Sequence, residues 1–327
     1  MKRFLNPILR EGGIGLALIV LALIFALLAP EFGTLRNVRN ILSQITINTI
    51  LAVGMTFVIL IGGIDLSVGS VMAFSMMVAA IVMSNSGMPA GLGVVLGVLA
   101  ALGIGAAVGF MNGWISERWK LPSFIVTLGI LNVARGAALM STGAQSIYEF
   151  PAPFMAFGAS TVFGNVVPSV FLVALALVAI SWFVLTRTVF GRMLYAIGNN
   201  EEAVRLSGHN PSRYKIIAFT LAGLAAGIAG IINISRLTIA SPIVGVGFEL
   251  NAIAAVIIGG TSLFGGKGSV VGTFLGACII GVLQNGLVLL GVQDFLRQMI
   301  TGAVIVLAVI LDYYRAKYAS SSPARLA

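Results

Sequence analysis

Residues 187–215 read RTVFGRMLYAIGNNEEAVRLSGHNPSRYK, the one long polar segment in a chain that is otherwise almost entirely apolar. Its basic residues are Arg187, Arg192, Arg205, Arg213 and Lys215. The segment lies between the apolar runs 167–186 and 216–235, each long enough to cross a bilayer as a helix. Because basic residues gather in loops on the cytosolic side of a membrane, the sequence predicts that 187–215 is a cytosolic loop.

The middle of this loop has the signals of a short amphipathic helix. Asn199 or Asn200 can cap its N-terminus. The acidic pair Glu201 and Glu202 suits a first turn, and Gly208 suits the C-terminal end. At helical spacing, one face of this helix would hold Ala203, Leu206 and Ser207. Such a face needs either lipid headgroups or another protein to cover it.

The composition of the whole chain is that of a membrane protein. Of its 327 residues, 59% are apolar and only 9% are charged, whereas a soluble domain of this size has about 25% charged residues. The net charge of +9 is explained by basic residues at the membrane ends of the spans. We therefore do not interpret the positive charge as affinity for nucleic acid.

The distribution of apolar residues predicts an all-α, polytopic membrane protein that forms a single membrane domain over residues 1–327. About ten runs have the length of a membrane helix; they are 14–29, 46–63, 66–84, 91–114, 123–142, 167–186, 216–235, 250–264, 269–290 and 296–312. We interpret the first run as an uncleaved span. Placing both termini in the cytosol puts 14 of the 19 Lys and Arg residues on that side. In this topology, residues 31–45 would form an external, basic helix at the interface.

An internal repeat predicts two related halves. Ile61-Gly-Gly-Ile-Asp-Leu-Ser-Val-Gly-Ser-Val71 aligns with Ile258-Gly-Gly-Thr-Ser-Leu-Phe-Gly-Gly-Lys-Gly-Ser-Val270, with two extra residues in the second copy. Glycine-interrupted apolar segments at corresponding places in two halves indicate a transport pathway. The alternative is a pair of similar tight hairpins at the membrane surface, and we place both turns near the cytosolic interface.

The run 91–114 has a small residue at every fourth position. The ladder consists of Gly93, Gly97, Ala101, Gly105, Gly109 and Gly113. In lipid, such faces let two helix backbones approach closely. The ladder therefore predicts a packing seam, and static packing is favoured over a surface on which helices glide.

No catalytic constellation is present in the sequence. The single histidine, His209, lies in the polar loop, where we expect it to be solvated. No His, Cys and carboxylate residues have the spacing of metal ligands, and GGTSLFGGKGS departs from the phosphate-loop pattern. We interpret Cys278, the one cysteine, as a packing residue. We therefore expect neither an enzyme nor a cofactor.

Polar residues inside or beside the apolar runs are the remaining candidates for a pathway or gate. Arg135 lies within the run 123–142 and must find a carboxylate, carbonyl groups or water, either for function or in a structural ion pair. Glu249 and Asn251 stand at the start of the short run 250–264, where they fit the cap of a half-helix. The full candidate set is Asn48, Asp65, Arg135, Glu249, Asn251, Gly259 and Gly260.

Several long stretches of the sequence resemble the membrane permeases of ABC sugar importers of the ribose, galactose and xylose type. They are AVGMTFVILIGGIDLSVGSV (52–71), LPSFIVTLGILNVARG (121–136), GRMLYAIGNNEEAVRLSG (191–208), ASP (240–242), ELNAIAAVIIGGTSLFGGKGSV (249–270) and QMITGAVIVLAVILD (298–312). The resemblance covers nearly the whole chain and follows the family's order.

The resemblance implies a paired, homodimeric permease in the inner membrane that moves a monosaccharide by alternating access. The sugar would come from an extracytoplasmic binding protein, and a separate cytosolic ATPase subunit would hydrolyse ATP. In that family the segment matching 191–208 couples the permease to the ATPase. The coupling residues implied here are Gly191, Asn199, Glu201, Glu202, Ala203 and Gly208.

Three other functions remain open on the sequence alone. An ion-coupled secondary transporter would need a buried titratable carboxylate, for which Asp65 is nearly the only candidate. An ABC permease for another polar solute, such as a nucleoside, a branched amino acid or a furanosyl signal, would leave the same composition. A membrane scaffold is disfavoured by the polar-loop helix and by the repeated glycine turns.

Overall fold

The computed structural model describes residues 2–84 and 87–320, without the side chains of residues 2–10, 311–313 and 315–320. The described chain is helical apart from one small antiparallel sheet of two strands. Its elements are α1 (Lys2–Leu28), α2 (Leu35–Leu60), α3 (Val68–Met83), α4 (Ala90–Trp119), α5 (Ser123–Met140), α6 (Ala152–Ala159), β1 (Thr161–Val162), β2 (Val167–Pro168), α7 (Ser169–Arg187), α8 (Val189–Asn199), α9 (Glu201–Leu206), α10 (Pro211–Leu237), α11 (Phe248–Ile258), α12 (Val270–Leu289) and α13 (Asp294–Ser320).

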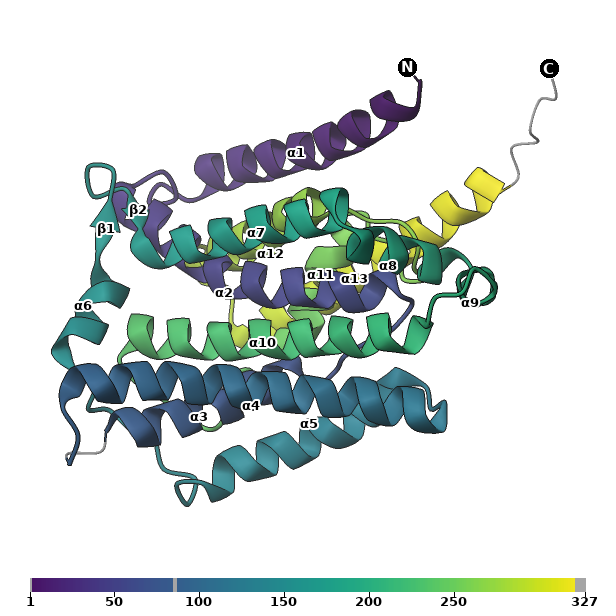
Figure 1. The fold of residues 1–327 in the computed structure, drawn as a ribbon. Helices are drawn as coiled ribbons and strands as arrows, with labels where there is room; N and C mark the ends of the chain where they lie inside the picture. The colour runs from purple at the N-terminus through teal and green to yellow at the C-terminus, as the bar shows by residue number, and fades with distance from the viewer. Residues whose placement is uncertain (1, 85–86, 321–327) are drawn as a thin grey trace, which may run out of the picture.

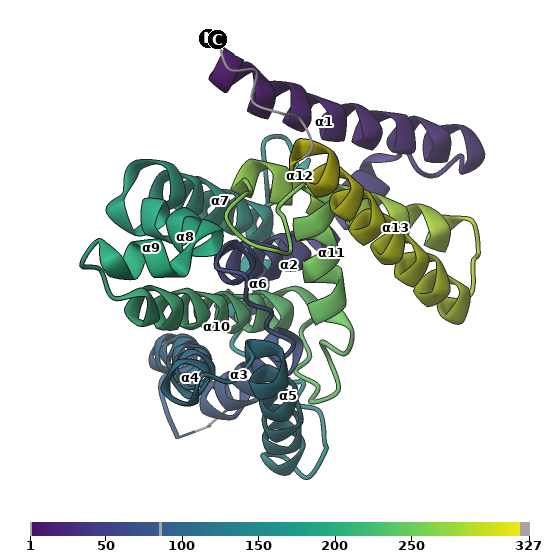
Figure 2. The same cartoon turned by 90° about the vertical axis from the view of Figure 1, so that its right-hand side faces the viewer.

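The long helices run side by side along one direction, with α2 near the middle (Figure 1). Figure 2 views the bundle along its length and shows α7, α10, α11 and α12 around α2, all of which contact it. In the most apolar part of α2, 83% of the residues are buried, against 11% in α1, which packs at the edge against α12. The apolar side chains of α2 therefore form the centre of the core, and α1 is peripheral.

All ten apolar runs predicted from the sequence coincide with helices, but the number of spans is not confirmed. Among the described residues, seven helices are long and apolar enough to cross a membrane: α1, α2, α4, α5, α7, α10 and α12. Helix α3 has 16 residues and α11 has 11. At about 1.5 Å per residue, α11 covers only about half of a hydrocarbon core about 30 Å thick. The prediction of a half-length helix in this region is confirmed.

Residues 31–45 do not form the separate interfacial helix predicted from the sequence. Thr34 caps α2 by accepting a hydrogen bond from the Asn37 N–H, 3.3 Å away. From there the helix continues for 26 residues to Leu60, because Ile41 and Ile45 already belong to its buried face. The basic residues that suggested an interfacial segment are the first turns of the central helix.

The predicted small-residue seam is confirmed; Gly93 and Gly97 face α3, and the rest of the ladder faces α10. A Cβ atom at Gly105 or Gly109 would overlap the backbone of α10 at Gly223 and Phe219. The seam ends at Gly113, where a Cβ would lie 2.7 Å from the Ile216 Cα. Because the backbones touch along three turns, α4 and α10 form one closely packed pair.

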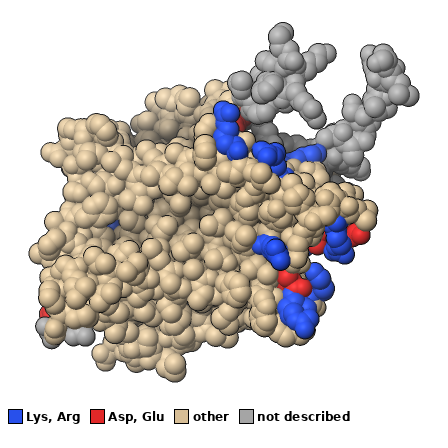
Figure 3. All heavy atoms as spheres, in the orientation of Figure 1, with Lys and Arg blue, Asp and Glu red and all other residues tan. Residues whose placement is uncertain are grey.

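The two ends of the bundle differ in chemistry. We call the end that carries α8 and α9 the loop end; α6 and the β1–β2 hairpin lie at the opposite end (Figure 1). On the face drawn in Figure 3, most of the Lys, Arg, Asp and Glu side chains gather at the loop end. Helix α1 begins, and α13 ends, at this same end (Figure 1).

Candidate functional site

The polar loop folds as two consecutive helices, α8 and α9, rather than as one. The Thr188 hydroxyl caps α8 by accepting a hydrogen bond from the Gly191 N–H at 3.2 Å. Gly191 is buried, and a Cβ there would overlap the backbone of α7 at Leu185. Gly191 therefore allows the tight turn between α7 and α8, and it does not face outward toward a partner.

The predicted caps of the short helix are confirmed in α9, with Asn200 and not Asn199 as the N-cap. The Asn200 Oδ1 accepts a hydrogen bond from the Ala203 N–H at 3.0 Å. Gly208 has a φ of +86°, and its N–H donates to the Arg205 carbonyl at 3.0 Å. The next N–H, of His209, donates to Val204 at 3.3 Å. This pair of bonds is the Schellman motif, which favours glycine at the left-handed position.

One face of α9 is not covered by any part of the chain that the structure describes. The face predicted from the sequence, Ala203, Leu206 and Ser207, is exposed, and Leu206 has 80% of its surface accessible. The helix rests on the rest of the protein through Val204, which is buried. We call the three exposed residues the α9 face; it projects at the charged end of the molecule (Figure 1).

The two repeated glycine turns end their helices in the same way. After α2, the Gly62 N–H donates to Ile59 at 2.9 Å and the Gly63 N–H donates to Val58 at 3.0 Å. Gly62 takes a φ of +75°. These are again the two bonds of a Schellman motif.

The second turn reproduces this pattern after α11. The Gly260 N–H donates to Ile257 at 2.7 Å, and the Thr261 N–H donates to Val256 at 3.0 Å. Gly260 takes a φ of +81°. By hydrogen bonding, Gly260 therefore corresponds to Gly62, which shifts the sequence alignment by one residue. The shift arises because Gly259 occupies the cap position that Ile61 occupies after α2.

The two turns meet at the loop end. The N–H of Gly266, in the second turn, donates to the carbonyl of Leu60 at 2.9 Å. Leu60 is the last residue of α2, so its carbonyl cannot accept a hydrogen bond from within its own helix. The second copy of the repeat thus caps the helix of the first copy.

Helix α8 is seated directly on this contact. A Cβ at Gly198 would overlap both the Leu60 carbonyl and the Gly266 nitrogen. The Asn199 Nδ2 donates to the Gly266 carbonyl at 3.1 Å and to the Tyr195 carbonyl at 2.8 Å. We call Leu60, Gly198, Asn199 and Gly266 the glycine junction. It joins the polar loop to both turns, a contact that the sequence did not reveal because it is made through backbone atoms.

Asp65 lies inside the first turn and is almost completely buried. Its Oδ1 accepts hydrogen bonds from the Ser67 N–H at 2.8 Å and the Ser67 hydroxyl at 2.6 Å. The Asn112 Nδ2 of α4 lies 3.4 Å from the other carboxyl oxygen. Burial raises the pKa of the Asp65 carboxyl, and these hydrogen bonds oppose the shift. Asp65 therefore ties the turn to α4.

Arg135 stabilises the loop that precedes the half-helix α11. Its Nη1 donates to the carbonyls of Pro242 and Val244, at 2.5 and 2.8 Å. Carbonyl groups were one of the three kinds of partner that the sequence allowed for Arg135. Backbone carbonyls that are shielded from water in an irregular loop need such hydrogen-bond partners.

The predicted cap of α11 is corrected by the structure. The N-cap is Gly247, with a φ of +80°. Glu249 lies in the first turn, and its Oε1 accepts a hydrogen bond from the Gly247 N–H at 3.1 Å. Asn251 is inside the helix, where its Oδ1 accepts a hydrogen bond from the Gln284 Nε2 of α12 at 3.2 Å. The left-handed backbone at position 247 favours glycine over a side-chain cap.

The candidate pathway residues lie in separate places. Asn48 is buried within α2, and Asp65 belongs to the first turn. Gly259 packs against the backbone of α12 at Gly272, so it serves the α11–α12 contact. Glu249 and Asn251 lie in the first turns of α11, and Arg135 of α5 contacts the loop that precedes this helix.

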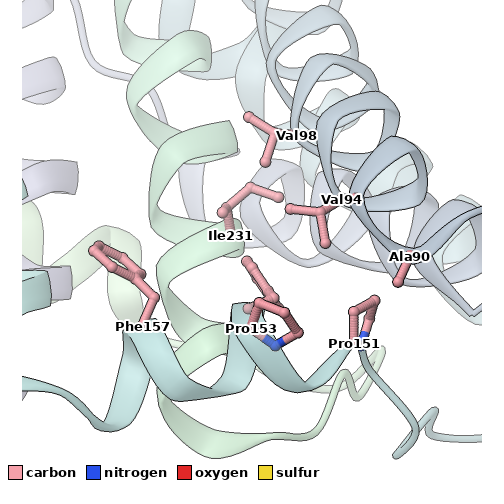
Figure 4. A pocket seen from close by; sticks show the side chains of 9 residues that line it. Ala90, Val94, Val98, Pro151, Pro153, Phe157 and Ile231 are labelled. Carbon is pink, nitrogen blue, oxygen red and sulfur yellow. The ribbon is translucent and has the colours of Figure 1, made fainter.

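A hollow of about 380 Å³ lies near the opposite end, between α4, α6 and α10 (Figure 4). Its lining is Ala90, Gly91, Val94, Val98, Pro151, Pro153, Phe154, Phe157 and Ile231. In Figure 4 the side chains of Val94 and Val98 lie opposite that of Ile231. An apolar lining of this kind offers no hydrogen-bonding side chain to a polar solute.

These features define the class of protein: a helical protein with several helices of membrane-spanning length and a polar-loop helix whose outer face is exposed. The family described as "Branched-chain amino acid transport system / permease component" matches residues 37–309, and the chain belongs to this family. Among solved structures, none matches the chain.

Several curated relatives are similar over nearly their whole length. The ribose import permease of Escherichia coli K12 is 44% identical over 301 residues, covering 91% of this chain and 92% of the relative. The ribose import permease of Bacillus subtilis 168 is 44% identical over 310 residues, covering 94% of each chain. The D-allose transport system permease of Escherichia coli K12 is 39% identical, covering 90% of this chain and 89% of the relative.

Proposed function

We propose that this chain is the membrane permease subunit of an ATP-driven importer for a monosaccharide. The observation that carries the proposal is the placement of the polar loop. Its helix α9 presents an uncovered face with Leu206 at its centre, while α8 is seated on both glycine turns through Asn199 and Gly266. Relatives named as ribose and allose permeases support a sugar as the solute.

The proposed mechanism is alternating access driven from the cytosol. A separate ATPase subunit docks on the α9 face and hydrolyses ATP, so the chain itself is not an enzyme and needs no cofactor. Movement of α8 and α9 is transmitted to Leu60 at the end of α2 and to Gly266, between α11 and α12. Because the glycine junction holds both turns, a movement of α8 and α9 displaces both repeats together. The shared Schellman turns support the proposal of two related halves.

The solute pathway is proposed to run beside the half-helix α11. Glu249 lies in the first turn of this helix, Arg135 of α5 contacts the loop before it, and Asn251 accepts a hydrogen bond from Gln284 of α12. Polar groups at such a broken helix can bind a polar solute weakly enough to release it. A second permease copy would complete the pathway.

The proposed assembly is embedded in the inner membrane. The loop end faces the cytosol together with both termini, in accord with the gathering of charged side chains there. An extracytoplasmic sugar-binding protein delivers solute at the opposite end. The ATPase subunit, the binding protein, a second copy of the chain and the lipid bilayer are the proposed partners; no nucleic acid is involved.

The experiment is solute uptake by proteoliposomes that hold the purified permease with its ATPase and binding protein. We expect uptake to require ATP, and Leu206→Asp to abolish both ATPase association and uptake because a charge replaces the exposed apolar contact. The control is Phe163→Asp, which places the same charge at another exposed apolar residue, with 75% of its surface accessible, in the hairpin at the opposite end. This variant should keep ATPase association. Uptake that proceeds without ATP would contradict the proposal.

A second candidate solute is a branched-chain amino acid, which the family description names. It predicts the same assembly and the same ATP requirement. Competition of labelled ribose uptake by other sugars and by leucine distinguishes the two. Displacement by sugars alone supports the monosaccharide, and transport of leucine in place of sugars would overturn that part of the proposal.

A further inference from the structure

The carboxylate of Glu201 is engaged within the chain. The Lys215 Nζ lies 2.5 Å from the Glu201 Oε2 and 3.1 Å from the Glu117 Oε1. These three residues belong to α9, α10 and α4, so one ammonium group bridges a short surface helix and a long apolar helix. The Ser212 hydroxyl donates to the other oxygen of Glu117 at 2.5 Å and helps to orient it.

The bridge is better shielded from water than the other ion pairs nearby. The side chains of Glu117 and Lys215 have 11% and 17% of their surface accessible, whereas Lys120, which also pairs with Glu117, has 63%. Exposed pairs contribute little because water and salt screen them. Lys215 is therefore the stronger partner of Glu117.

The bridge lies beside a hollow between α9 and the body of the protein. A polar cavity of about 480 Å³ separates α9 from the segment that joins α4 to α5. Its lining is Ser116, Glu117, Lys120, Leu121, Pro122, Glu201, Glu202, Arg205 and Lys215. Val204 is the one buried side chain of α9. On the side of this hollow, the ion pair between Glu201 and Lys215 attaches α9 to α10.

The far side of the bridge is a closely packed pair of helices. Helix α4 carries Glu117 and α10 carries Lys215, and the two backbones touch at Gly105, Gly109 and Gly113. A displacement of α9 that is passed to Lys215 therefore moves both helices as one body. This route is separate from the glycine junction, which leads to α2 and to the turn before α12.

We propose that Glu117 is a positioning residue for ATP-driven transport, acting through Lys215 to fix α9 to the α4–α10 pair. The inference rests on the proposed function and deepens it. The ATPase docks on the α9 face, and the Glu117–Lys215–Glu201 bridge carries part of the resulting movement into α4 and α10. Without the bridge, the ATPase still binds and hydrolyses ATP, but less of that movement reaches the pathway.

The test measures solute molecules transported per ATP hydrolysed in the same proteoliposomes. The variants are Glu117→Gln and Lys215→Met, with Lys215→Arg as the conservative variant. The matched control is Lys120→Met, which removes the exposed partner of Glu117 and leaves the bridge intact. ATPase association and the melting temperature of the purified permease are measured for every variant.

For Glu117→Gln and Lys215→Met we expect normal ATPase association and a transport ratio lower by about fivefold or more. Lys215→Arg should recover most of the ratio, and Lys120→Met should match the wild type. Unchanged ratios in the first two variants would overturn the proposal, as would an equal loss in Lys120→Met. Loss of ATPase association together with uptake would also overturn it, since the bridge would then serve docking. Failure of the proposed function is recognised separately, because the wild type itself would then show no ATP-dependent uptake.

Discussion

The side-chain amide of Asn199 donates to the backbone carbonyl of Gly266, 3.1 Å away, although 67 residues separate them in the sequence. The same Nδ2 donates to the Tyr195 carbonyl one turn earlier in α8. One amide therefore joins the end of α8 to the second glycine turn. The neighbouring Asn200 has the reverse role, because its oxygen accepts from the α9 backbone.

These opposite roles predict opposite responses to the same substitution. Asn199→Asp replaces the donor with a carboxylate that cannot donate and that repels the Gly266 carbonyl. We expect the free energy of unfolding to fall by at least about 1 kcal/mol. We also expect less solute to be taken up per ATP hydrolysed. Asn200→Asp keeps an accepting oxygen at the N-cap and should behave as the wild type. Uptake and thermal unfolding of both variants check this; equal behaviour of the pair would contradict the assignment of donor and acceptor.

The seam between α4 and α10 predicts a difference between two glycines of one helix. Gly105→Ala places a methyl group into the Gly223 backbone, whereas a Cβ at Gly103 meets open space. We expect Gly105→Ala to destabilise the detergent-solubilised permease by about 1–3 kcal/mol. Gly103→Ala should be neutral or slightly stabilising, because alanine favours helix over glycine. Thermal unfolding followed by circular dichroism makes the comparison, and similar losses in both would argue against a seam at this face.

The contact of Arg135 with the loop before α11 predicts that different substitutions of Arg135 reduce uptake to different degrees. Arg135→Met leaves the carbonyls of Pro242 and Val244 without their donor, at a cost of about 1–3 kcal/mol for each group. We expect uptake to be lost while the ATPase still associates, because Arg135 belongs to α5 and is not on the α9 face. Arg135→Lys keeps one charged donor and should retain part of the uptake. Wild-type uptake in Arg135→Met would show that this loop needs no such support.

The environment of Asp65 predicts how its neutral analogue behaves. Burial raises the pKa of Asp65 above its ordinary value of 3.8, so its protonated form stabilises the folded state. That contribution is lost as the pH rises through the folded-state pKa. Asp65→Asn should therefore unfold at the same or a higher temperature at neutral pH. Its stability should also lack the pH dependence that the Asp65 carboxyl causes. The Asn112 Oδ1, buried and without a hydrogen-bond partner among the described residues, can accept from the new amide after a flip.

The same variant tests the ion-coupled alternative. A transporter driven by protons or sodium through Asp65 would stop working in Asp65→Asn. An importer driven by ATP should keep most of its uptake, because the carboxylate then serves only to hold the turn to α4. ATP-dependent uptake by the variant decides between them.

Features with a local cause were predictable from the sequence. The capping of α9 follows from Asn200 and Gly208, and the half-length of α11 follows from its short apolar run. Features with a non-local cause were not. In the sequence, Gly198 cannot be told from any other helical glycine. Only the structure shows that the backbones of Leu60 and Gly266 lie against it. A hydrogen bond from a side chain to a distant carbonyl leaves no pattern of residue types.

Two errors show where local signals mislead. Arg36 and Arg39 suggested an interfacial helix, yet Thr34 starts a single helix that runs on into the core. Asn251 suggested a cap, but α11 begins earlier, at a glycine whose left-handed φ fixes the start. In both cases the helix begins earlier in the sequence than expected.

The bond between the Gly266 N–H and the Leu60 carbonyl lies beneath Gly198 and is closed off by α8. An amide in that position exchanges its hydrogen with solvent only when α8 lifts away. Deuterium uptake at Gly266 therefore reports directly on the opening of this contact. The protein carries a natural probe, without any attached label, for the moment in each cycle when the polar loop separates from the bundle.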